Sequence, residues 1–236
     1  MNVPVCFFAA ETNLSFVLSR ATVEARVILV VLALFSVFAW YMMVFKGLQM
    51  KRAKKLNRFF DSEFRAQKDV LGIFDRRLDV FGCPYFAIYQ EGCVALDARL
   101  KAGGGLRQTT LTLKGMEHVK RALESAVARE SIKLESGLIL LASAVSGGPF
   151  LGLLGTVWGV MDTFAMVGQQ QSAALETMAP GVSAALITTV AGLVVAIPSM
   201  FGYNLLVHRL RVQTVELDNF AQELVSKMEI EYLKED

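Results

Sequence analysis

The chain has 236 residues, of which 54% are hydrophobic and 19% are charged, and its formal net charge is +2. This composition is too apolar for a water-soluble domain of this length and too charged for a chain that lies within a membrane throughout. Three uncharged runs, residues 27–45, 136–161 and 177–207, approach or exceed the roughly 20 residues with which a helix spans a bilayer. We therefore predict an all-α membrane protein with three transmembrane helices.

The distribution of basic residues predicts how these helices are oriented. Lys and Arg are frequent between the first two runs and recur after the third, whereas residues 162–176 contain neither. Because Lys and Arg collect on the cytoplasmic side of inserted helices, the middle segment and the C-terminus are predicted to be cytoplasmic and the N-terminus to lie outside. The predicted organisation is an outer segment 1–23, a first span 24–46, a cytoplasmic helical domain 47–135, a second span 136–161, an outer loop 162–176, a third span 177–207 and a cytoplasmic C-terminal helix 208–236.

The N-terminal part of the chain predicts a surface helix followed by an anchor. Residues 2–20 mix apolar residues with few charges, which is typical of an amphipathic helix on the outer membrane surface. No small-residue cleavage site follows the first apolar run, so the first span is expected to be retained. The basic residues after it are interpreted as contacts with anionic lipid headgroups rather than with nucleic acid. These residues are Lys51, Arg52, Lys54, Lys55 and Arg58.

The cytoplasmic segments predict further helices. Apolar positions recur between charges over residues 47–81, the pattern breaks at Gly82 and Pro84, and another helix is predicted over residues 85–99. Residues 103–105 are three glycines and predict a reversal of the chain. The amphipathic pattern of residues 116–134 predicts a helix that continues without a break into the second span. A similar period carries the third span on to near residue 231, so the two long helices predict a helical cytoplasmic bundle, with no strands.

Glycine spacing predicts close helix packing in the second span. Gly148, Gly152, Gly155 and Gly159 follow one another at steps of four, three and four, which marks a helix face that another helix approaches closely. Thr156 lies beside this face. Its hydroxyl either bonds a carbonyl of its own helix, as threonine commonly does in membranes, or serves another group.

The third span and the outer loop carry further candidate residues. Pro180 fits the first turn of the span, whereas Pro198 lies inside it and either kinks the helix near its cytoplasmic end or is a tolerated break. Asp162 and Glu176 bound the outer loop; they are either solvated carboxylates or an outer mouth that attracts cations. Thr188 and its neighbour in sequence point about 100° apart on a helix, so only one of the two can face a pore squarely.

The polar residues of the last two spans cannot ionise near neutral pH. Hydroxyls relay protons but do not hold one of their own, so either the chain conducts nothing or a partner supplies the acid. The same absence of a buried base or nucleophile argues against an intramembrane enzyme, and no cofactor is expected. Cys6, Cys83 and Cys93 have no metal-ligand spacing and are interpreted as packing residues. The polar residues are Ser143, Ser146, Thr156, Ser183, Thr188, Thr189, Ser199 and Asn204.

Two long motifs resemble a known family. The chain is similar to the TolQ and ExbB proton-channel proteins, relatives of the flagellar stator protein MotA, most strongly from residue 117 to residue 233. Three spans rather than four argue against MotA itself, and residues 217–220 lean slightly towards TolQ. The matching stretches are PFLGLLGTVWGVM at 149–161, APG at 179–181, ALITT at 185–189, AIP at 196–198 and YN at 203–204.

The resemblance implies a bacterial inner-membrane motor. A homopentameric ring of this chain would surround the transmembrane helices of two copies of a TolR-like or ExbD-like single-span partner, whose membrane aspartate is the missing acid. Thr156 and Thr189 match the pore-facing threonines near this aspartate. Inward proton flow would rotate the ring relative to the partner, and the work would cross the periplasm through a TolA-like or TonB-like protein. The N-terminus would then be periplasmic, with no nucleic acid as a partner.

One departure from the family and one alternative function remain at this point. Many TolQ and ExbB chains carry a glutamate early in the third span, where this chain has Ala184. A proton-path role of that glutamate therefore does not carry over. The alternative function is a passive membrane scaffold, in which Thr156 and Thr189 serve helix packing alone. The choice between proton and sodium, and between the envelope processes served, stays open.

Overall fold

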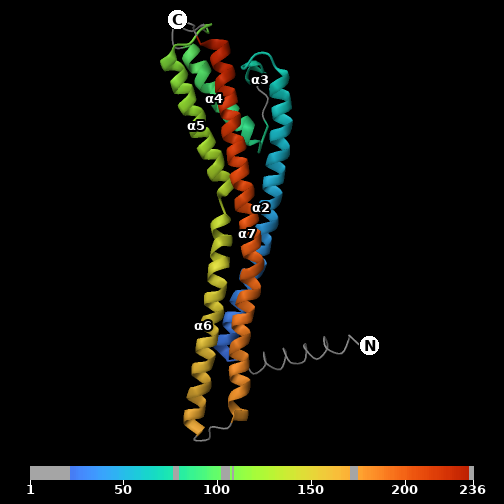
Figure 1. The fold of residues 1–236 in the computed structure, drawn as a ribbon, viewed down its shortest axis with the longest axis vertical. Helices are drawn as coiled ribbons and strands as arrows, with labels where there is room; N and C mark the ends of the chain where they lie inside the picture. Colours follow the sequence, from blue (N-terminus) through green and yellow to red (C-terminus); the bar gives the residue numbers. More distant parts are fainter. Residues whose placement is uncertain (1–21, 77–79, 102–106, 108, 171–174, 234–236) are drawn as a thin grey trace, which may run out of the picture. The chain divides into compact units, whose positions relative to one another are not determined.

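The structure is a computed structural model that describes residues 22–76, 80–101, 107, 109–170 and 175–233, with the side chains at 169–170 and 175–177 excepted. The described part contains helices and no strand, and Leu111 and Leu233 form an isolated β-bridge. The predicted amphipathic segment 2–20, Cys6 and the glycine reversal at 103–105 lie outside the described residues. The helices are α2 (Val23–Ala66), α3 (Gly72–Asp75), α4 (Pro84–Leu100), α5 (Leu113–Glu135), α6 (Leu138–Gln170) and α7 (Leu175–Tyr232) (Figure 1).

Three of the described helices are long and apolar enough to cross a membrane, as the three predicted spans require. They are α2, α6 and α7, and two of them continue well past their apolar runs. α7 reaches Tyr232, as predicted, and α2 continues as one helix to Ala66. The residues that follow the first apolar run are rich in Lys and Arg, which favour helix in water, so the change in hydropathy does not end the helix.

The prediction of an unbroken helix into the second span is wrong. α5 ends at Glu135, and α6 begins at Leu138. Between them Gly137 has a φ of +84°, a left-handed conformation that glycine adopts without steric cost and that commonly ends helices. The amphipathic period continues through Gly137, so it predicted an unbroken helix. Periodicity indicates which face of a helix is buried, but it does not indicate where φ changes sign.

The end of α6 and the start of α7 also differ from the boundaries that composition suggested. α6 continues to Gln170 and α7 begins at Leu175, so helix occupies much of the segment 162–176 that we assigned to a loop. Pro180 consequently lies beyond the first turn of α7 rather than within it. Pro198 is also inside α7, which continues through it. Hydropathy marks where an apolar run ends, and polar residues outside it can remain helical.

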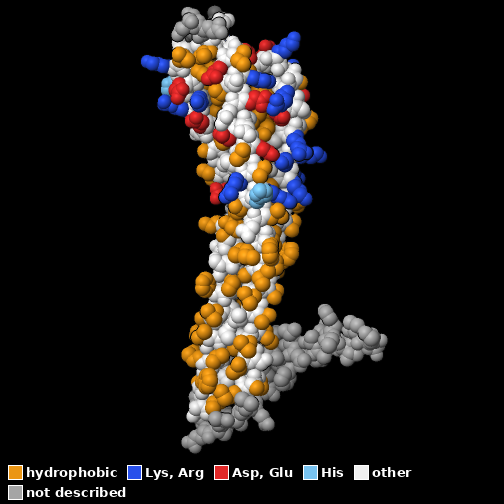
Figure 2. Space-filling model, viewed as in Figure 1, with side chains coloured by type: hydrophobic (Ala, Val, Ile, Leu, Met, Phe, Trp, Pro, Cys, Tyr) orange, Lys and Arg blue, Asp and Glu red, His pale blue; other side chains and the backbone are white. Residues whose placement is uncertain are grey.

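The chain divides into two compact units, which we describe separately. The first unit holds the described residues within 1–44 and 137–204, and therefore the apolar parts of α2, α6 and α7. Apolar side chains cover much of its surface (Figure 2). Among them Phe150 is 72% exposed, Phe201 66% and Leu34 65%. A helix surface of this kind suits contact with lipid rather than with water.

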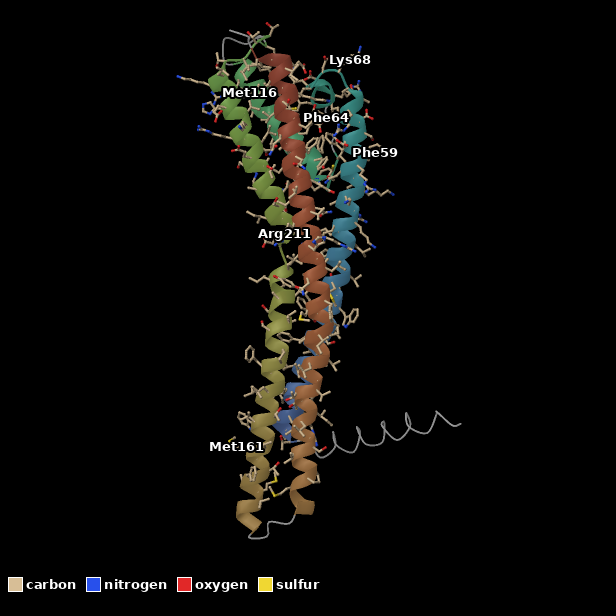
Figure 3. All side chains as sticks on the ribbon, in the orientation of Figure 1. Phe59, Phe64, Lys68, Met116, Met161 and Arg211 are labelled. Atoms are coloured by element: carbon tan, nitrogen blue, oxygen red, sulfur yellow. The ribbon has the colours of Figure 1, made fainter. Side chains whose placement is uncertain are left out.

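The second unit, residues 45–136 and 205–236, is a helical bundle with its own core. Phe60 of α2 lies at its centre, with ring centroids 5.5 Å from Tyr89 and 6.1 Å from Phe220, so α2, α4 and α7 meet through aromatic contacts. Phe64 is stacked on Phe60 one turn further along α2 (Figure 3). The Nζ of Lys227 lies 4.1 Å from the centroid of the Phe64 ring. The core includes Ala53, Phe60 and Phe64 of α2, Phe86, Ile88, Tyr89 and Leu96 of α4, Met116, Val119 and Leu123 of α5, and Leu217, Phe220, Leu224 and Met228 of α7.

Tyr89 ties the connection between α2 and α3 to this core. The side chain is fully buried, its hydroxyl donates to the carbonyl of Val70 at 2.5 Å, and it accepts from the backbone N–H of Phe74 at 3.0 Å. Burial raises the pKa of Tyr89 far above its usual value, so the hydroxyl keeps its proton and its donor role at any physiological pH.

We expect Tyr89→Phe to lower the free energy of unfolding of the purified chain by about 1–3 kcal/mol, because it leaves two backbone groups without their buried partner. Tyr85→Phe is the matched control: the Tyr85 hydroxyl is half-buried and donates one bond, to the carbonyl of Glu216 at 3.1 Å. Denaturant unfolding in detergent, followed by circular dichroism, measures both. Equal losses for the two variants would contradict the role assigned to Tyr89.

Candidate functional site

The candidate site lies where α6 and α7 pack within the first unit. The two helices approach so closely that a Cβ built on Gly152 would lie 2.8 Å from the carbonyl oxygen of Thr188 and 3.0 Å from the Cα of Thr189. A Cβ on Gly148 would lie 3.0 Å from the carbonyl oxygen of Gly192. Backbone therefore meets backbone, a spacing that only small residues permit.

The other two predicted glycines face α7 of the same chain as well. A Cβ on Gly155 would lie 2.5 Å from the hydroxyl oxygen of Thr188, and one on Gly159 would lie 2.8 Å from the Cβ of Ala185. The four glycines of the sequence pattern are thus one contact surface between α6 and α7.

Three threonine hydroxyls converge on one carbonyl at this contact. Thr156 Oγ1 lies 3.0 Å from the carbonyl oxygen of Gly152, Thr188 Oγ1 lies 3.0 Å from it, and Thr189 Oγ1 lies 3.2 Å from it. The hydroxyls of Thr156 and Thr189 also contact each other directly, and either can be the donor. Thr156 therefore bonds its own helix and also contacts Thr189, and a role beyond this contact stays a prediction.

The hydrogen bond between the Thr156 and Thr189 hydroxyls can run in either direction, because the Gly152 carbonyl accepts from only one of them at a time. A carbonyl oxygen has two lone pairs, and inside a helix one of them serves the backbone, so three hydroxyls cannot all donate to it. Thr188 has a second acceptor, the carbonyl of Ala185 at 2.6 Å. Thr156 and Thr189 can then donate in either order, one to Gly152 and the other to its neighbour's oxygen. Such a pair can pass a proton by reversing its direction.

The adjacent threonines of α7, Thr188 and Thr189, differ in their exposure to solvent. Thr188 is fully buried against α6, whereas Thr156 and Thr189 are half-buried and reach the surface of the unit. Of these two adjacent residues only Thr189 is partly exposed, so only Thr189 can present its hydroxyl to a neighbouring molecule. Thr188 has the geometry of a packing residue.

The remaining predicted residues are not brought together with this pair by any hydrogen bond in the described part of the chain. Pro198 is half-buried, and the hydroxyl of its neighbour Ser199 donates to the carbonyl of Val195 at 2.7 Å. Asp162 is half-exposed, and the side chain of Glu176 lies outside the described residues. The outer mouth and the kink remain predictions.

Sequence reasoning missed the half of the contact that α7 supplies. Gly192 packs against the backbone of α6, since a Cβ on it would lie 2.5 Å from the carbonyl oxygen of Gly148, and Gly181 packs against Thr163. A signal was present: small residues recur along α7 at steps of three and four, matching the pattern that we used for α6. These residues are Gly181, Ala185, Thr188, Gly192 and Ala196.

Other reactive groups do not form a second site in the described residues. No group of three or more His, Cys, Asp or Glu side chains that could hold a metal is found there. Burial raises the pKa of both Cys83 and Cys93, that of Cys93 to about 12, so both thiols stay protonated and unreactive at neutral pH. In sequence, the apolar runs 136–161 and 177–207 contain no Asp, Glu, His, Lys or Arg.

The similarity of this chain to known proteins includes the part that holds the candidate site. The sequence model of the MotA/TolQ/ExbB proton channel family matches residues 98–219, which include all the threonines and glycines of the site. The Tol-Pal system protein TolQ of Pseudomonas aeruginosa is 33% identical over 82% of this chain and 83% of its own length, and TolQ of Haemophilus influenzae is 32% identical over 92% and 94%. The biopolymer transport protein ExbB of Xanthomonas campestris is 34% identical over 84% and 79%.

Proposed function

This chain belongs to the MotA/TolQ/ExbB proton channel family, and on that basis we propose that it is the proton-channel subunit of an inner-membrane motor driven by the proton motive force. The motor would energise a process of the cell envelope, either of the Tol-Pal type or of the TonB type. Family membership confirms the resemblance seen in the motifs, and the TolQ relatives accord with the slight lean towards TolQ.

The observation that carries the proposal is the hydroxyl pair of Thr156 and Thr189. The two side chains come from different helices, contact each other and reach the surface of the unit. A pair that donates in either direction can relay a proton, but it cannot store one, because hydroxyls do not ionise near neutral pH. Since the last two spans contain no acid in sequence, the storing group must come from a partner.

We propose an assembly that supplies this acid. Five copies of the chain would form a ring around the membrane helices of two copies of a TolR-like or ExbD-like protein, each with a membrane aspartate beside the hydroxyl pair. The N-terminus and the 162–176 segment would be periplasmic, the second unit would be cytoplasmic, and Asp162 and Glu176 would form the outer mouth. A TolA-like or TonB-like protein would transmit the movement across the periplasm.

The energy available is sufficient for such a movement. One charge that crosses about 100 mV releases roughly 2.3 kcal/mol, so a few protons supply enough to move one packed helix surface past another. Each proton would neutralise one partner aspartate and release it from the hydroxyl pair. Pro198 would provide a point of bending near the cytoplasmic end of the third span.

Removal of either hydroxyl tests this function. We expect Thr156→Val or Thr189→Val to lower proton flux by about tenfold or more in proteoliposomes that contain the chain and its partner, because a hydroxyl relay loses its donor and acceptor. The matched control is Thr163→Val. The Thr163 hydroxyl is buried and donates to the carbonyl of Gly159 in its own helix at 2.7 Å, so flux should be unchanged.

A passive scaffold is the second candidate, and one observation favours it: Thr156 donates to a carbonyl of its own helix, as a packing threonine does. Under this function both valine variants keep normal flux and a normal envelope phenotype. Loss of flux in an assembly whose stoichiometry is unchanged by native mass spectrometry excludes the scaffold. Normal flux in both variants overturns the proton-channel proposal.

A further inference from the structure

A groove in the second unit is lined by basic and polar side chains that have no part in the proposed proton conduction. It lies between α2 and α7 and has a volume of about 390 Å³. All of its lining residues belong to the second unit, so it is formed within one compact body. The lining residues are Met50, Lys51, Lys54, His208, Arg209, Val212 and Gln213.

The groove is strongly cationic. Three basic side chains and a histidine line it, and there is no Asp or Glu among its described lining residues. Lys54 pairs with Glu216 at 3.0 Å, while no ion pair to Lys51 or Arg209 is found within the described parts of the chain. Lys and Arg side chains gather on this unit beside a histidine (Figure 2). The charge of the groove therefore calls for an anion.

Gln213 adds a second, independent requirement on the ligand, which is a hydrogen-bond donor. The residue is only 5% exposed, and its amide nitrogen donates to the carbonyl of Met50 at 2.8 Å. Because that carbonyl can only accept, the amide cannot turn over, and its oxygen is fixed on the other side. This oxygen is buried, has no hydrogen-bond partner among the described residues, and belongs to a residue that lines the groove. A buried acceptor without a donor costs about 1–3 kcal/mol, so a ligand that brings a donor gains affinity here.

The position of the groove points to the source of such a ligand. Met50 and Gln213 follow apolar runs that end at Phe45 and Val207. At about 1.5 Å per helical residue, both lie roughly 8–9 Å past the hydrocarbon. The headgroup layer is about 5–8 Å thick on each side of a bilayer. The groove therefore lies where the headgroups meet the water.

We propose that this groove is a specific binding site for the headgroup of an anionic phospholipid that carries a hydroxyl. The phosphate contacts Lys51 and Arg209, and the headgroup hydroxyl donates to the Gln213 amide oxygen. A glycerol headgroup fits both requirements. A phosphate without a separate hydroxyl fits less well, because its oxygens serve as acceptors for Lys51 and Arg209 and only a protonated phosphate oxygen could donate to Gln213. A soluble phosphate ester shares this chemistry, so the test must separate the two sources.

Native mass spectrometry of the full chain in a nonionic detergent tests the site. The probes are phosphatidylglycerol, phosphatidic acid, phosphatidylcholine and soluble glycerol 3-phosphate. We expect saturable binding of phosphatidylglycerol in preference to the other three. Arg209→Gln should weaken it by about fivefold, the effect of one basic residue on an anionic headgroup. Arg211→Gln is the matched control, since Arg211 is exposed on the same helix, carries the same charge and does not line the groove (Figure 3).

Gln213→Leu separates the hydroxyl contact from the charge. It should reduce the preference for phosphatidylglycerol over phosphatidic acid and leave the binding of phosphatidic acid unchanged, so a folded variant is recognised by that binding. Equal losses from Arg209→Gln and Arg211→Gln, or equal binding of phosphatidylcholine, would show diffuse attraction and overturn the site. Displacement of phosphatidylglycerol by glycerol 3-phosphate at equal concentration would overturn the lipid as the ligand. None of these outcomes depends on proton flux.

Discussion

Replacement of Gly152 by alanine is expected to destabilise the packing of α6 on α7 by about 1–3 kcal/mol. The added Cβ would lie 2.8 Å from the Thr188 carbonyl oxygen and 3.0 Å from the Thr189 Cα. Both are backbone atoms of a helix and cannot rotate aside as a side chain can. The helices must separate, and the hydroxyls of Thr156 and Thr189 must separate with them, so proton flux should fall together with stability.

Gly147→Ala is the control for this change. Gly147 is also inside α6, but no atom lies within 4 Å of a Cβ built there. Both substitutions gain the same helix propensity, up to about 1 kcal/mol, so the difference between them isolates the clash. Thermal unfolding of the two purified variants in detergent, followed by circular dichroism, gives that difference. A Gly152→Ala variant as stable as Gly147→Ala would show that α6 and α7 do not pack in this way.

Ala184→Glu is expected to cost several kcal/mol, although the family resemblance implies glutamate at this position. Ala184 is 5% exposed and packs against Ala25 of α2, which is 3% exposed. A glutamate there adds volume to a filled contact, at about 1–3 kcal/mol, and places a carboxylate among apolar groups, which adds a further penalty of similar size. The expected result is a lower unfolding temperature and a poor yield of purified protein.

Two further variants divide this cost into its parts. Ala184→Gln adds nearly the same volume without the charge, so it should be less harmful than Ala184→Glu. Ala25→Gly in the Ala184→Glu background removes the opposing methyl group and should restore part of the stability. If Ala184→Glu unfolds at the temperature of the parent chain, then contact with Ala25 is not what makes alanine the fitting residue here.

The spans were predictable because hydropathy over some 20 residues is a strong local signal, and the helix of residues 85–99 was predictable because Pro84 marks its start. The break at Gly137 was not. Gly147, Gly148 and Gly152 are helical in α6, whereas Gly137 has a φ of +84°. Glycine permits both conformations, and the packing around each position selects between them.

Some features of the candidate site were likewise predictable from the sequence, and others were not. The steps between the glycines of α6 predicted a close helix contact, and the family motifs indicated Thr156 and Thr189. Neither signal could indicate that both hydroxyls and that of Thr188 converge on the Gly152 carbonyl, because this depends on the register of two helices whose residues are more than thirty positions apart.

By itself the sequence determined the three spans, the absence of an acid from the last two, and the small-residue faces along which they can pack, since each is a property of a short stretch of chain. The tertiary structure decided which residues share a contact. Lys46 shows the difference: hydropathy makes it the polar end of the first span, yet it is 3% exposed, with its Nζ 3.4 Å from the Leu134 carbonyl oxygen and 3.4 Å from the Ser136 hydroxyl. The burial of a charge depends on what covers it, and here the cover comes from the end of α5, some ninety residues along the chain.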